Sequence, residues 1–533
     1  MIKVFKDIAK DGNVVLRIEI NDKSFYLSSR YFPLKESEKI SENFTAKNLA
    51  ILVFGLGNPY LIYFLSKKYP DSEVVVVEPI EEIFNTVVSD ENLKKFLSSS
   101  NIRIKLTKDE EELKAILFEM PYFDYYFNPQ YRVALPDFEK WEVAVKDVLR
   151  NLEINRNTLK RFGNVWVKNF ILSFENVLKA RGVKELFCKF RNTSAVVVGA
   201  GPSLDKDLEL VRELSKNLLV VSVDTSWSYL VSEGIKPDFV ITVDPQLKNF
   251  VYNILEKDYK DTLFVCDSMY PPIIYKFVPY ENIFVFDSPL KFWNVVRMML
   301  GIEKGELMVG GSVICTAIDF ANKLGCEYIV LAGVDLSFPN KKIYFKGNYY
   351  EVSNFLVSNI FSPYDQWNIL SKYPLIETIS KNGDKILTDP RMLTFKRWIE
   401  NYIAIENVKV INISSNGVGI ANSLGLDELN ILNRFLDRDR IVALKDEIQN
   451  LPFVSVDDSW VKKVRTKILD IIYTFNKRGV YGVLEVLERD EFLKSMIELS
   501  LQDVLLSEYT EEDFLNSLSE ELRYIGRIIR FNF

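Results

Sequence analysis

The sequence predicts an α/β protein with a Rossmann-like, doubly wound central domain, a smaller α/β N-terminal domain and a helical C-terminal domain. Short apolar runs that alternate with turns and helical segments predict the central parallel sheet. A strand, a glycine turn, a helix and a second strand predict an earlier βαβ unit. The expected boundaries are 1–150 for the N-terminal domain, 151–190 for a helical connector, 191–427 for the central domain and 428–533 for the C-terminal domain.

The composition is that of a globular chain without a long disordered tract. The chain has 533 residues, of which 48% are hydrophobic and 26% charged. A net charge of -7 argues against a general affinity for nucleic-acid phosphates. There is no window of roughly 18 uninterrupted apolar residues and no apolar signal-peptide stretch at the start. We therefore expect a cytoplasmic protein without a membrane or nucleic-acid partner.

The absence of histidine restricts the chemistry that this chain can perform. With 0 His, a Ser-His-Asp or Cys-His nucleophile system and an imidazole base are excluded. Proton transfer must use Asp, Glu, Tyr, Lys or solvent. The 4 Cys lack CxxC spacing, so we expect small buried hydrophobic side chains rather than a zinc site.

The N-terminal βαβ unit carries a glycine turn followed by an acid. The strand Ala50 to Phe54 runs into Gly55-Leu56-Gly57-Asn58-Pro59, and the next strand, Glu73 to Val77, ends on Glu78. This order is typical of a pocket for a dinucleotide or S-adenosylmethionine. The third glycine is missing, however, and Pro59 stands where the helix begins. We expect a Rossmann-like scaffold, with cofactor binding as the alternative.

The central domain contains seven apolar runs that we expect to form one parallel sheet. They are Ser194 to Val198, Leu218 to Val223, Phe239 to Val243, Leu263 to Cys266, Ile283 to Phe286, Tyr328 to Leu331 and Val408 to Ile413. After about Leu426 apolar residues recur at spacings of three and four, through Val442 to Ile448, Val461 to Phe475 and Phe492 to Leu506. This spacing predicts a bundle of helices.

Two glycine-rich turns are candidate anion sites. In Gly-Ala-Gly-Pro-Ser-Leu at 199–204, the glycines permit a sharp turn and close approach to a ligand, and the following helix directs N–H groups at an anion. A tight turn capped by Ser203 is the alternative. Gly310-Gly311-Ser312-Val313 forms a second candidate cradle, with an ordinary helix start as its alternative. The amides of Gly201 and Ser312 are the expected donors to a phosphate.

Acids stand at the ends of three predicted strands. Asp224, Asp244 and Asp335 fall at the sheet edge where open α/β sheets bind ligands. Asp224 and Asp244 could share one crevice and accept from sugar hydroxyls or hold Mg²⁺. The alternative makes them independent turn residues, with Asp224 or Ser226 as a helix N-cap. The basic stretch Lys341 to Lys346 is a solvated loop or a lid over a phosphate.

Five motifs in this order resemble those of the motility accessory factor family, bacterial proteins related to the pterin diphosphokinase-like domain family. The resemblance is close over 199–338 and looser over residues 50–79 and onward to Ile420. The motifs are Gly-Ala-Gly-Pro-Ser-Leu, Val-Asp-Thr-Ser, Gly-Ile-Lys-Pro-Asp-Phe-Val-Ile-Thr-Val-Asp-Pro-Gln, Gly-Gly-Ser-Val and Leu-Ala-Gly-Val-Asp-Leu-Ser-Phe.

The resemblance implies a glycosyltransferase with a core similar in fold to bacterial sialyltransferases. It implies transfer of a nonulosonic acid, of the pseudaminic or legionaminic type, from a CMP-activated donor to Ser or Thr of flagellin. The implied nucleotide contacts are Gly199, Gly201, Pro202, Ser203, Thr225, Gln246, Gly311 and Ser312. Asp224, Asp244 and Asp335 are the implied candidates for the carboxylate that assists deprotonation of the acceptor.

This chain departs from the family at the segment after Asp335. Members often carry histidine there, and the related sialyltransferases use a histidine base, whereas this chain has Ser337-Phe338-Pro339-Asn340-Lys341. Two alternatives therefore remain open. One is ATP-dependent pyrophosphoryl transfer to a hydroxymethylpterin, with Mg²⁺ at Asp224 and Asp244. The other is a flagellin-binding protein without catalytic activity.

Overall fold

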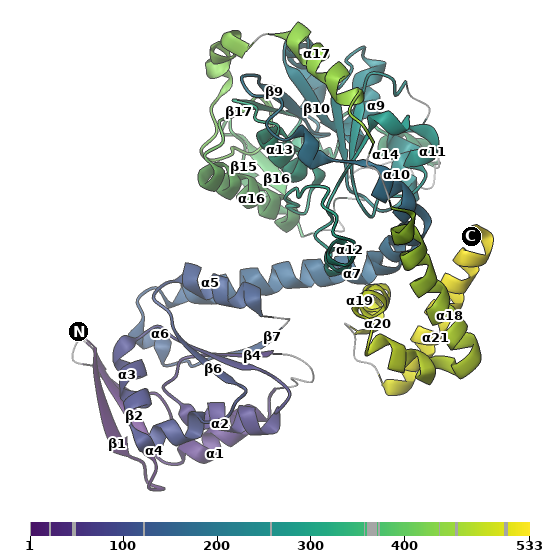
Figure 1. Cartoon of the computed structure of the whole chain (residues 1–533). Coiled ribbons are helices and arrows are strands. Elements are labelled where there is room, and N and C mark those ends of the chain that lie inside the picture. Colours follow the sequence, from purple (N-terminus) through teal and green to yellow (C-terminus); the bar gives the residue numbers. More distant parts are fainter. Residues whose placement is uncertain are drawn as a thin grey trace. The chain divides into compact units, whose positions relative to one another are not determined.

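The computed structural model divides into two compact units, Met1–Thr158 and Leu159–Phe533 (Figure 1). It describes residues 2–20, 23–44, 50–120, 123–255, 258–356, 358–359, 370, 374–435, 437–453, 457–505 and 510–532. Leu506, the predicted end of one C-terminal apolar run, lies outside these residues. Within the described residues, no helix is both long enough and apolar enough to cross a bilayer.

The first unit contains two sheets. A three-stranded antiparallel sheet is formed by β1 (Lys3–Ile8), β2 (Val14–Ile20) and β3 (Lys23–Tyr26). A four-stranded parallel sheet has the order β6-β5-β4-β7, with β4 (Ala50–Phe54), β5 (Val74–Glu78), β6 (Ile102–Leu106) and β7 (Phe123–Phe127). Its helices are α1 (Pro33–Ser41), α2 (Pro59–Lys68), α3 (Glu81–Ser89), α4 (Glu91–Lys94), α5 (Glu110–Glu119) and α6 (Tyr131–Ala134). The predicted βαβ unit is β4-α2-β5.

The second unit is built on eight parallel strands in the order β17-β14-β9-β10-β11-β12-β13-β8. They are β8 (Arg181–Gly182), β9 (Ala195–Val198), β10 (Leu219–Val223), β11 (Phe239–Thr242), β12 (Leu263–Asp267), β13 (Ile283–Phe286), β14 (Ile329–Ala332) and β17 (Val410–Asn412). All seven predicted strands are present, and the predicted fold class is confirmed. The buried strands are almost continuously apolar because helices cover both faces of a parallel sheet.

The direction in which the chain adds strands reverses beside β9. Strands β10 to β13 extend the sheet on one side of β9, whereas β14 and β17 extend it on the other. Helices connect the strands: α8 (Leu204–Ser215), α9 (Asp224–Ser232), α10 (Leu247–Asn253), α11 (Ile274–Phe277), α12 (Lys291–Leu300), α13 (Val313–Lys323), α14 (Tyr349–Leu356) and α16 (Pro390–Glu406). The gap between β9 and β14 is therefore the switch point, where such sheets bind ligands.

The chain after β14 forms a small hairpin and a 3-10 helix, and the chain after β17 forms another 3-10 helix. β15 (Ile376–Ile379) pairs with β16 (Lys385–Thr388) in antiparallel register, and neither was predicted. The segment after β14 contains η4 (Pro339–Lys341), and β17 is followed by η5 (Leu426–Phe435).

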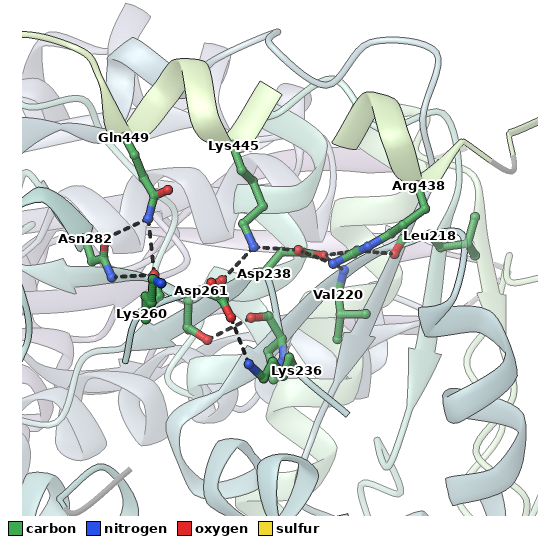
Figure 2. Close-up of polar contacts among 12 residues, drawn as sticks. Leu218, Val220, Lys236, Asp238, Lys260, Asp261, Asn282, Arg438, Lys445 and Gln449 are labelled. Atoms are coloured by element: carbon green, nitrogen blue, oxygen red, sulfur yellow. Dashed lines mark hydrogen bonds and ion pairs between the residues drawn. The ribbon is translucent and has the colours of Figure 1, made fainter. Parts of the chain in front are cut away.

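Helix α17 (Arg438–Gln449) packs at the opposite, N-terminal edge of the strands (Figure 2). Asp238 directly precedes β11 and is fully buried. Its carboxylate accepts hydrogen bonds from Arg438 at 2.7 and 2.8 Å and from Lys445 at 2.8 Å. Gln449 also donates to Asn282 at 2.9 Å. These contacts fix α17 to one edge of the sheet and leave the other edge for a ligand.

The C-terminal helices share an apolar core with part of the central domain. They are α18 (Asp458–Leu487), α19 (Glu491–Ser500), α20 (Gln502–Leu505) and α21 (Glu511–Asn532). Phe492 of α19 lies 5.5 Å, ring to ring, from Phe292 of α12. Phe292 in turn lies 4.8 Å from Phe170, in the second half of the long helix α7 (Phe138–Lys179). The helical C-terminus is thus confirmed, and it packs on the sheet domain.

The prediction that all the cysteines are buried is wrong for one of them. Cys266, Cys315 and Cys326 are buried, but Cys188 is exposed. Cys188 lies in a turn with φ 61°, and its N–H donates to the carbonyl of Lys323 at 2.8 Å. The backbone of this turn is held against the protein while the thiol faces outward.

Candidate active site

The turn Gly199 to Ser203 packs against the turn that follows β14. The N–H of Gly199 donates to Ala332 and the N–H of Gly201 to Gly333, both at 2.8 Å. A Cβ atom on Gly199 would lie 2.5 Å from the carbonyl oxygen of Gly333, and one on Gly201 would lie 2.3 Å from Asp335 Oδ2. These glycines are thus needed where two backbone turns meet. The Gly201 amide, expected to hold a phosphate, is already bonded within the protein.

Asp335 joins the end of β14 to the start of α8. Its Oδ2 accepts from the backbone N–H of Ser203 at 2.8 Å, and its side chain is buried. Burial raises the pKa of Asp335 to about 6. Neither Asp335 Oδ1 nor the Ser203 hydroxyl has a hydrogen-bond partner among the described residues. Ser203 precedes α8 without capping it through its side chain, and the carboxylate lies there instead.

Asp224 is a buried residue whose two oxygens are both engaged. Oδ2 accepts from the Thr242 hydroxyl at 2.6 Å, and Oδ1 accepts from the N–H of Thr225 at 2.7 Å. Burial raises the pKa of Asp224, and the nearby charge of Asp244 raises it further. Asp224 is the first residue of α9, and neither it nor Ser226 makes a side-chain cap. Asp224 therefore joins the start of α9 to the end of β11.

Asp244 is more accessible than Asp224. It is half-buried and accepts from the backbone N–H of Gln246 at 2.9 Å and from the Gln246 side chain at 3.1 Å. Both contacts come from its own turn after β11. Of the three predicted carboxylates, Asp224 and Asp335 are buried, so Asp244 is the most accessible to a ligand.

The charges of these acids influence the pKa of two tyrosines. Burial raises the pKa of Tyr350, and the neighbouring Tyr344, Asp224 and Asp244 raise it further. Burial and the charge of Asp224 likewise raise the pKa of Tyr270. Tyr350 lies on α14, more than a hundred residues along the chain from Asp224. Sequence spacing alone carried no signal for these phenols.

Acids also end the next two strands of the sheet. Asp267, at the end of β12, accepts from the N–H of Met269 at 2.7 Å, and burial raises its pKa to about 7. Asp287, after β13, accepts from the Trp293 indole at 2.8 Å and from the backbone N–H of Lys304 at 3.0 Å. The sequence analysis did not single out either acid, although the rule of acids at strand ends would have found both. Their hydrogen bonds are internal to the fold.

The basic stretch Lys341 to Lys346 lies over the first glycine turn. The N–H of Phe345 donates to the carbonyl of Ala200 at 3.2 Å, and the N–H of Lys346 donates to the carboxylate of Asp205 at 3.0 Å. The Phe345 ring stacks on Tyr229 at 4.4 Å. These contacts make the stretch a strap across the turn and the start of α8.

The second glycine turn opens α13, which begins at the same edge of the sheet. Gly311 has φ 81°, a backbone conformation that residues with a side chain rarely adopt, and Ser312 makes no side-chain cap. A Cβ atom on Gly310 would lie 2.5 Å from the Trp398 ring. Gly310 thus serves packing, whereas Gly311 and Ser312 remain candidates for contact with a ligand.

The predicted Mg²⁺ ligands, Asp224 and Asp244, both accept hydrogen bonds within the protein. Both oxygens of Asp224 already accept hydrogen bonds from threonines. Among the residues that the structure describes, no three Asp, Glu or Cys side chains cluster as metal ligands would. Mg²⁺ in proteins is usually held by one or two carboxylates together with water and substrate phosphates. We therefore derive no chemical step from a metal at Asp224 and Asp244.

In the N-terminal unit, the protein's own side chains occupy the space around the glycine turn. Glu78 is fully buried and accepts from the N–H groups of Leu56 and Ile80, both at 2.8 Å, and from the Tyr131 hydroxyl. A Cβ atom on Gly55 would lie 2.5 Å from the Tyr131 ring. Burial raises the pKa of Glu78 to about 8. The acid that would bind a ribose in a dinucleotide site instead holds the turn.

A protein-family model matches part of the central domain. The model of the family described as 6-hydroxymethylpterin diphosphokinase MptE-like matches residues 168–341. These residues, which include the first part of the central domain, are similar to the MptE-like family. The matched residues include strands β8 to β14 and the glycine turns at 199–204 and 310–313.

Curated relatives come from Treponema pallidum (strain Nichols), and all three are uncharacterized proteins. One is 24% identical over 39% of this chain and 72% of its own length. The others are 27% and 24% identical, and the matches cover 59% and 52% of their lengths. The matches thus span little more than half of two of these relatives.

A solved structure has the same fold over almost the whole chain. It is the Maf glycosyltransferase of Magnetospirillum magneticum AMB-1, with a TM-score of 0.58 and 15% identity. The match covers 99% of this chain and 90% of that one. The resemblance to the motility accessory factor family, with its MptE-like central domain, is confirmed in domain family and fold.

Proposed function

We propose that this protein is a glycosyltransferase that moves a nonulosonic acid, of the pseudaminic or legionaminic type, from a CMP donor to Ser or Thr of flagellin. The observation that supports it most is the extent of the shared fold. Likeness to a Maf glycosyltransferase covers 99% of the chain, including the units on both sides of the MptE-like domain. A kinase for a small pterin has no evident use for either flanking part.

In the proposed reaction, the bond between the sugar and the CMP phosphate breaks as an oxocarbenium-like centre forms on the sugar. The acceptor hydroxyl bonds to that carbon and gives its proton to a carboxylate, while CMP leaves with the bonding electrons. Asp244 suits the role of base because it is half-buried and held only by its own turn. The Ser312 amide and the strap from Lys341 to Lys346 are the proposed contacts of the leaving phosphate.

The proposed donor contacts on the first turn act mainly through shape. Gly199 and Gly201 let the turn pack on Gly333, and Pro202 and Ser203 complete it. Thr225 and Gln246 hold the carboxylates of Asp224 and Asp244. These residues therefore shape the crevice in which the nucleotide would lie.

A diphosphokinase remains the second candidate because the family model bears that description. Thermal unfolding with CMP, CDP, ATP and S-adenosylmethionine, each with and without Mg²⁺, separates the candidates, since a ligand of the folded state raises the melting temperature. We expect stabilisation by CMP. Selective stabilisation by ATP with Mg²⁺ would favour the kinase, and no response to any nucleotide would favour a flagellin-binding protein without catalytic activity.

A further inference from the structure

The side chain of Asn169, on helix α7, joins the loops that follow two neighbouring strands of the parallel sheet. Its Nδ2 donates to the carbonyl of Pro245, after β11, at 2.9 Å and to the carbonyl of Met269, after β12, at 3.0 Å. All three residues are buried. One amide group thus bridges the carboxyl ends of two adjacent strands.

An asparagine side chain suits this place for a chemical reason. Its primary amide has two N–H donors, and each is used by a carbonyl on a different loop. Serine and threonine have one donor, an ionised aspartate has none, and glutamine is longer by one methylene group. An apolar residue at position 169 would leave two buried carbonyls without this donor.

The contact with Pro245 reaches the carboxylate of Asp244 through a single peptide group. The carbonyl of Pro245 accepts from Asn169, and the N–H of the same peptide, which belongs to Gln246, donates to Asp244 Oδ1 at 2.9 Å. Hydrogen bonds in such a chain polarise and strengthen one another. Pro245 also restricts Asp244 to extended conformations. The orientation of this peptide therefore determines where the carboxylate of Asp244 finds its donor.

Helix α7 gives Asn169 a packed support. The ring of Phe170, the next residue, lies 4.8 Å from Phe292 and 6.4 Å from Trp293, and all three are buried in one apolar core. Ser173, one turn further along, donates to the backbone carbonyl of Asn169 at 2.6 Å. Reactive groups are held in place by residues that are themselves fixed by packing and hydrogen bonds. Asn169 has both.

We propose that Asn169 is a positioning residue for the glycosyl transfer, and that it orients the Asp244 carboxylate through the peptide between Pro245 and Gln246. The assignment rests on the proposed function for the role of Asp244 as the base. Asn169 lies 76 residues from Pro245 along the chain and belongs to none of the motifs in the sequence.

A double-mutant cycle on the full chain tests the assignment, with flagellin as acceptor and CMP-pseudaminic or CMP-legionaminic acid as donor. Asn169→Ala should lower kcat by about 10-fold or more and leave the KM for the donor within about twofold, because it displaces the base. In the Asp244→Asn background the same substitution should change kcat by less than about twofold, because the base is already absent. Ser173→Ala, which removes a buried hydroxyl from the same helix, is the matched control and should keep the wild-type kcat.

Melting temperatures separate positioning from folding. Any destabilisation by Asn169→Ala should be equal in both backgrounds, whereas its loss of kcat should appear only where Asp244 is present. An equal loss of kcat in both backgrounds, or a wild-type kcat in Asn169→Ala, would show that Asn169 has a structural role alone. If the alanine variant does not fold, Asn169→Leu, of similar volume, takes its place in the cycle.

The contact can also be tested without the reaction. Absence of transfer by the wild type would count against the proposed function, and amide hydrogen exchange then tests the positioning. The N–H of Gln246 should exchange at least about tenfold faster in Asn169→Ala than in Ser173→Ala, because its peptide has lost its support. Equal exchange in the two variants would overturn the assignment.

Discussion

The carboxylate of Asp335 accepts a hydrogen bond from the backbone N–H of Ser203 at 2.8 Å, across 132 residues of sequence. The backbone carbonyl of Asp335 also accepts from the N–H of Val418 at 2.9 Å. One residue thus ties together the segments that follow β14 and β17 and the start of α8. The positive end of α8 already faces an acid of the protein. A bound nucleotide must therefore be recognised mainly by neighbouring groups.

The packing of the two turns makes Gly201 intolerant of a side chain. Gly201→Ala places a Cβ atom 2.3 Å from Asp335 Oδ2 and 2.7 Å from the carbonyl oxygen of Gly333. We expect a loss of roughly 1–3 kcal/mol in the free energy of unfolding, measured with urea. Gly425→Ala is the control, because no atom lies within 4 Å of its added Cβ. Equal stability of the two variants would contradict the packing role of Gly201.

The two acids of the crevice should respond differently to substitution. Asp244→Asn should lower glycosyl transfer by about 100-fold or more through loss of the base, with little change in melting temperature. Asp224→Ala removes the acceptor of the Thr242 hydroxyl and the Thr225 N–H, so it should cost about 1–3 kcal/mol of stability. Paired melting and transfer measurements check both. If Asp244→Asn were destabilised but transferred the sugar normally, Asp244 would have the structural role and would not be the base.

Glu78 should make stability depend on pH in the N-terminal unit. Its pKa is raised from 4.5 to about 8, so between these values the folded state binds a proton that the unfolded state lacks. The stability that this proton contributes is fully present below pH 4.5 and is lost as pH rises toward 8. Relative to Glu78→Gln, the wild type should lose stability over this window, by at most about 1.4 kcal/mol per pH unit. Urea unfolding at several pH values checks this, and a constant difference would contradict it.

The ion pairs of the buried Asp238, which hold α17, should contribute more to the free energy of unfolding than a surface ion pair. Asp238→Ala leaves Arg438 and the buried Lys445 without their carboxylate, so we expect a loss of about 3–5 kcal/mol. Lys236→Ala breaks an exposed pair with Asp261 and should change stability by less than about 1 kcal/mol. Thermal or urea unfolding of both variants measures the contrast. Similar effects would mean that α17 is held by other contacts.

Most of the sheet could be predicted because its strands are buried on both faces. Runs such as Ala195–Val198 and Ile329–Ala332 are wholly apolar and end at glycine turns. Hairpin β15–β16 escaped prediction because Ile376 and Ile379 are exposed and follow no core pattern. Strand β8 was missed because it has only 2 residues.

The positions of the candidate residues at the sheet edge were predictable, but their contacts were not. Acids at strand ends meet at one edge of a parallel sheet, so the positions of Asp224 and Asp244 followed from the pattern. Whether an acid is available depends on residues distant in sequence, such as Ser203 for Asp335. The charges of Asp224 and Asp244 raise the pKa of Tyr350 on the distant helix α14, and Lys206 lines a groove walled by the unpredicted hairpin.

Intact-mass spectrometry of flagellin, incubated with the purified protein and a CMP-activated nonulosonic acid, tests the central claim most directly. We predict that the wild type raises the flagellin mass in steps of one sugar and releases CMP, and that Asp244→Asn does neither. An unchanged flagellin mass, together with conversion of ATP and 6-hydroxymethylpterin by the same preparation, would contradict the account.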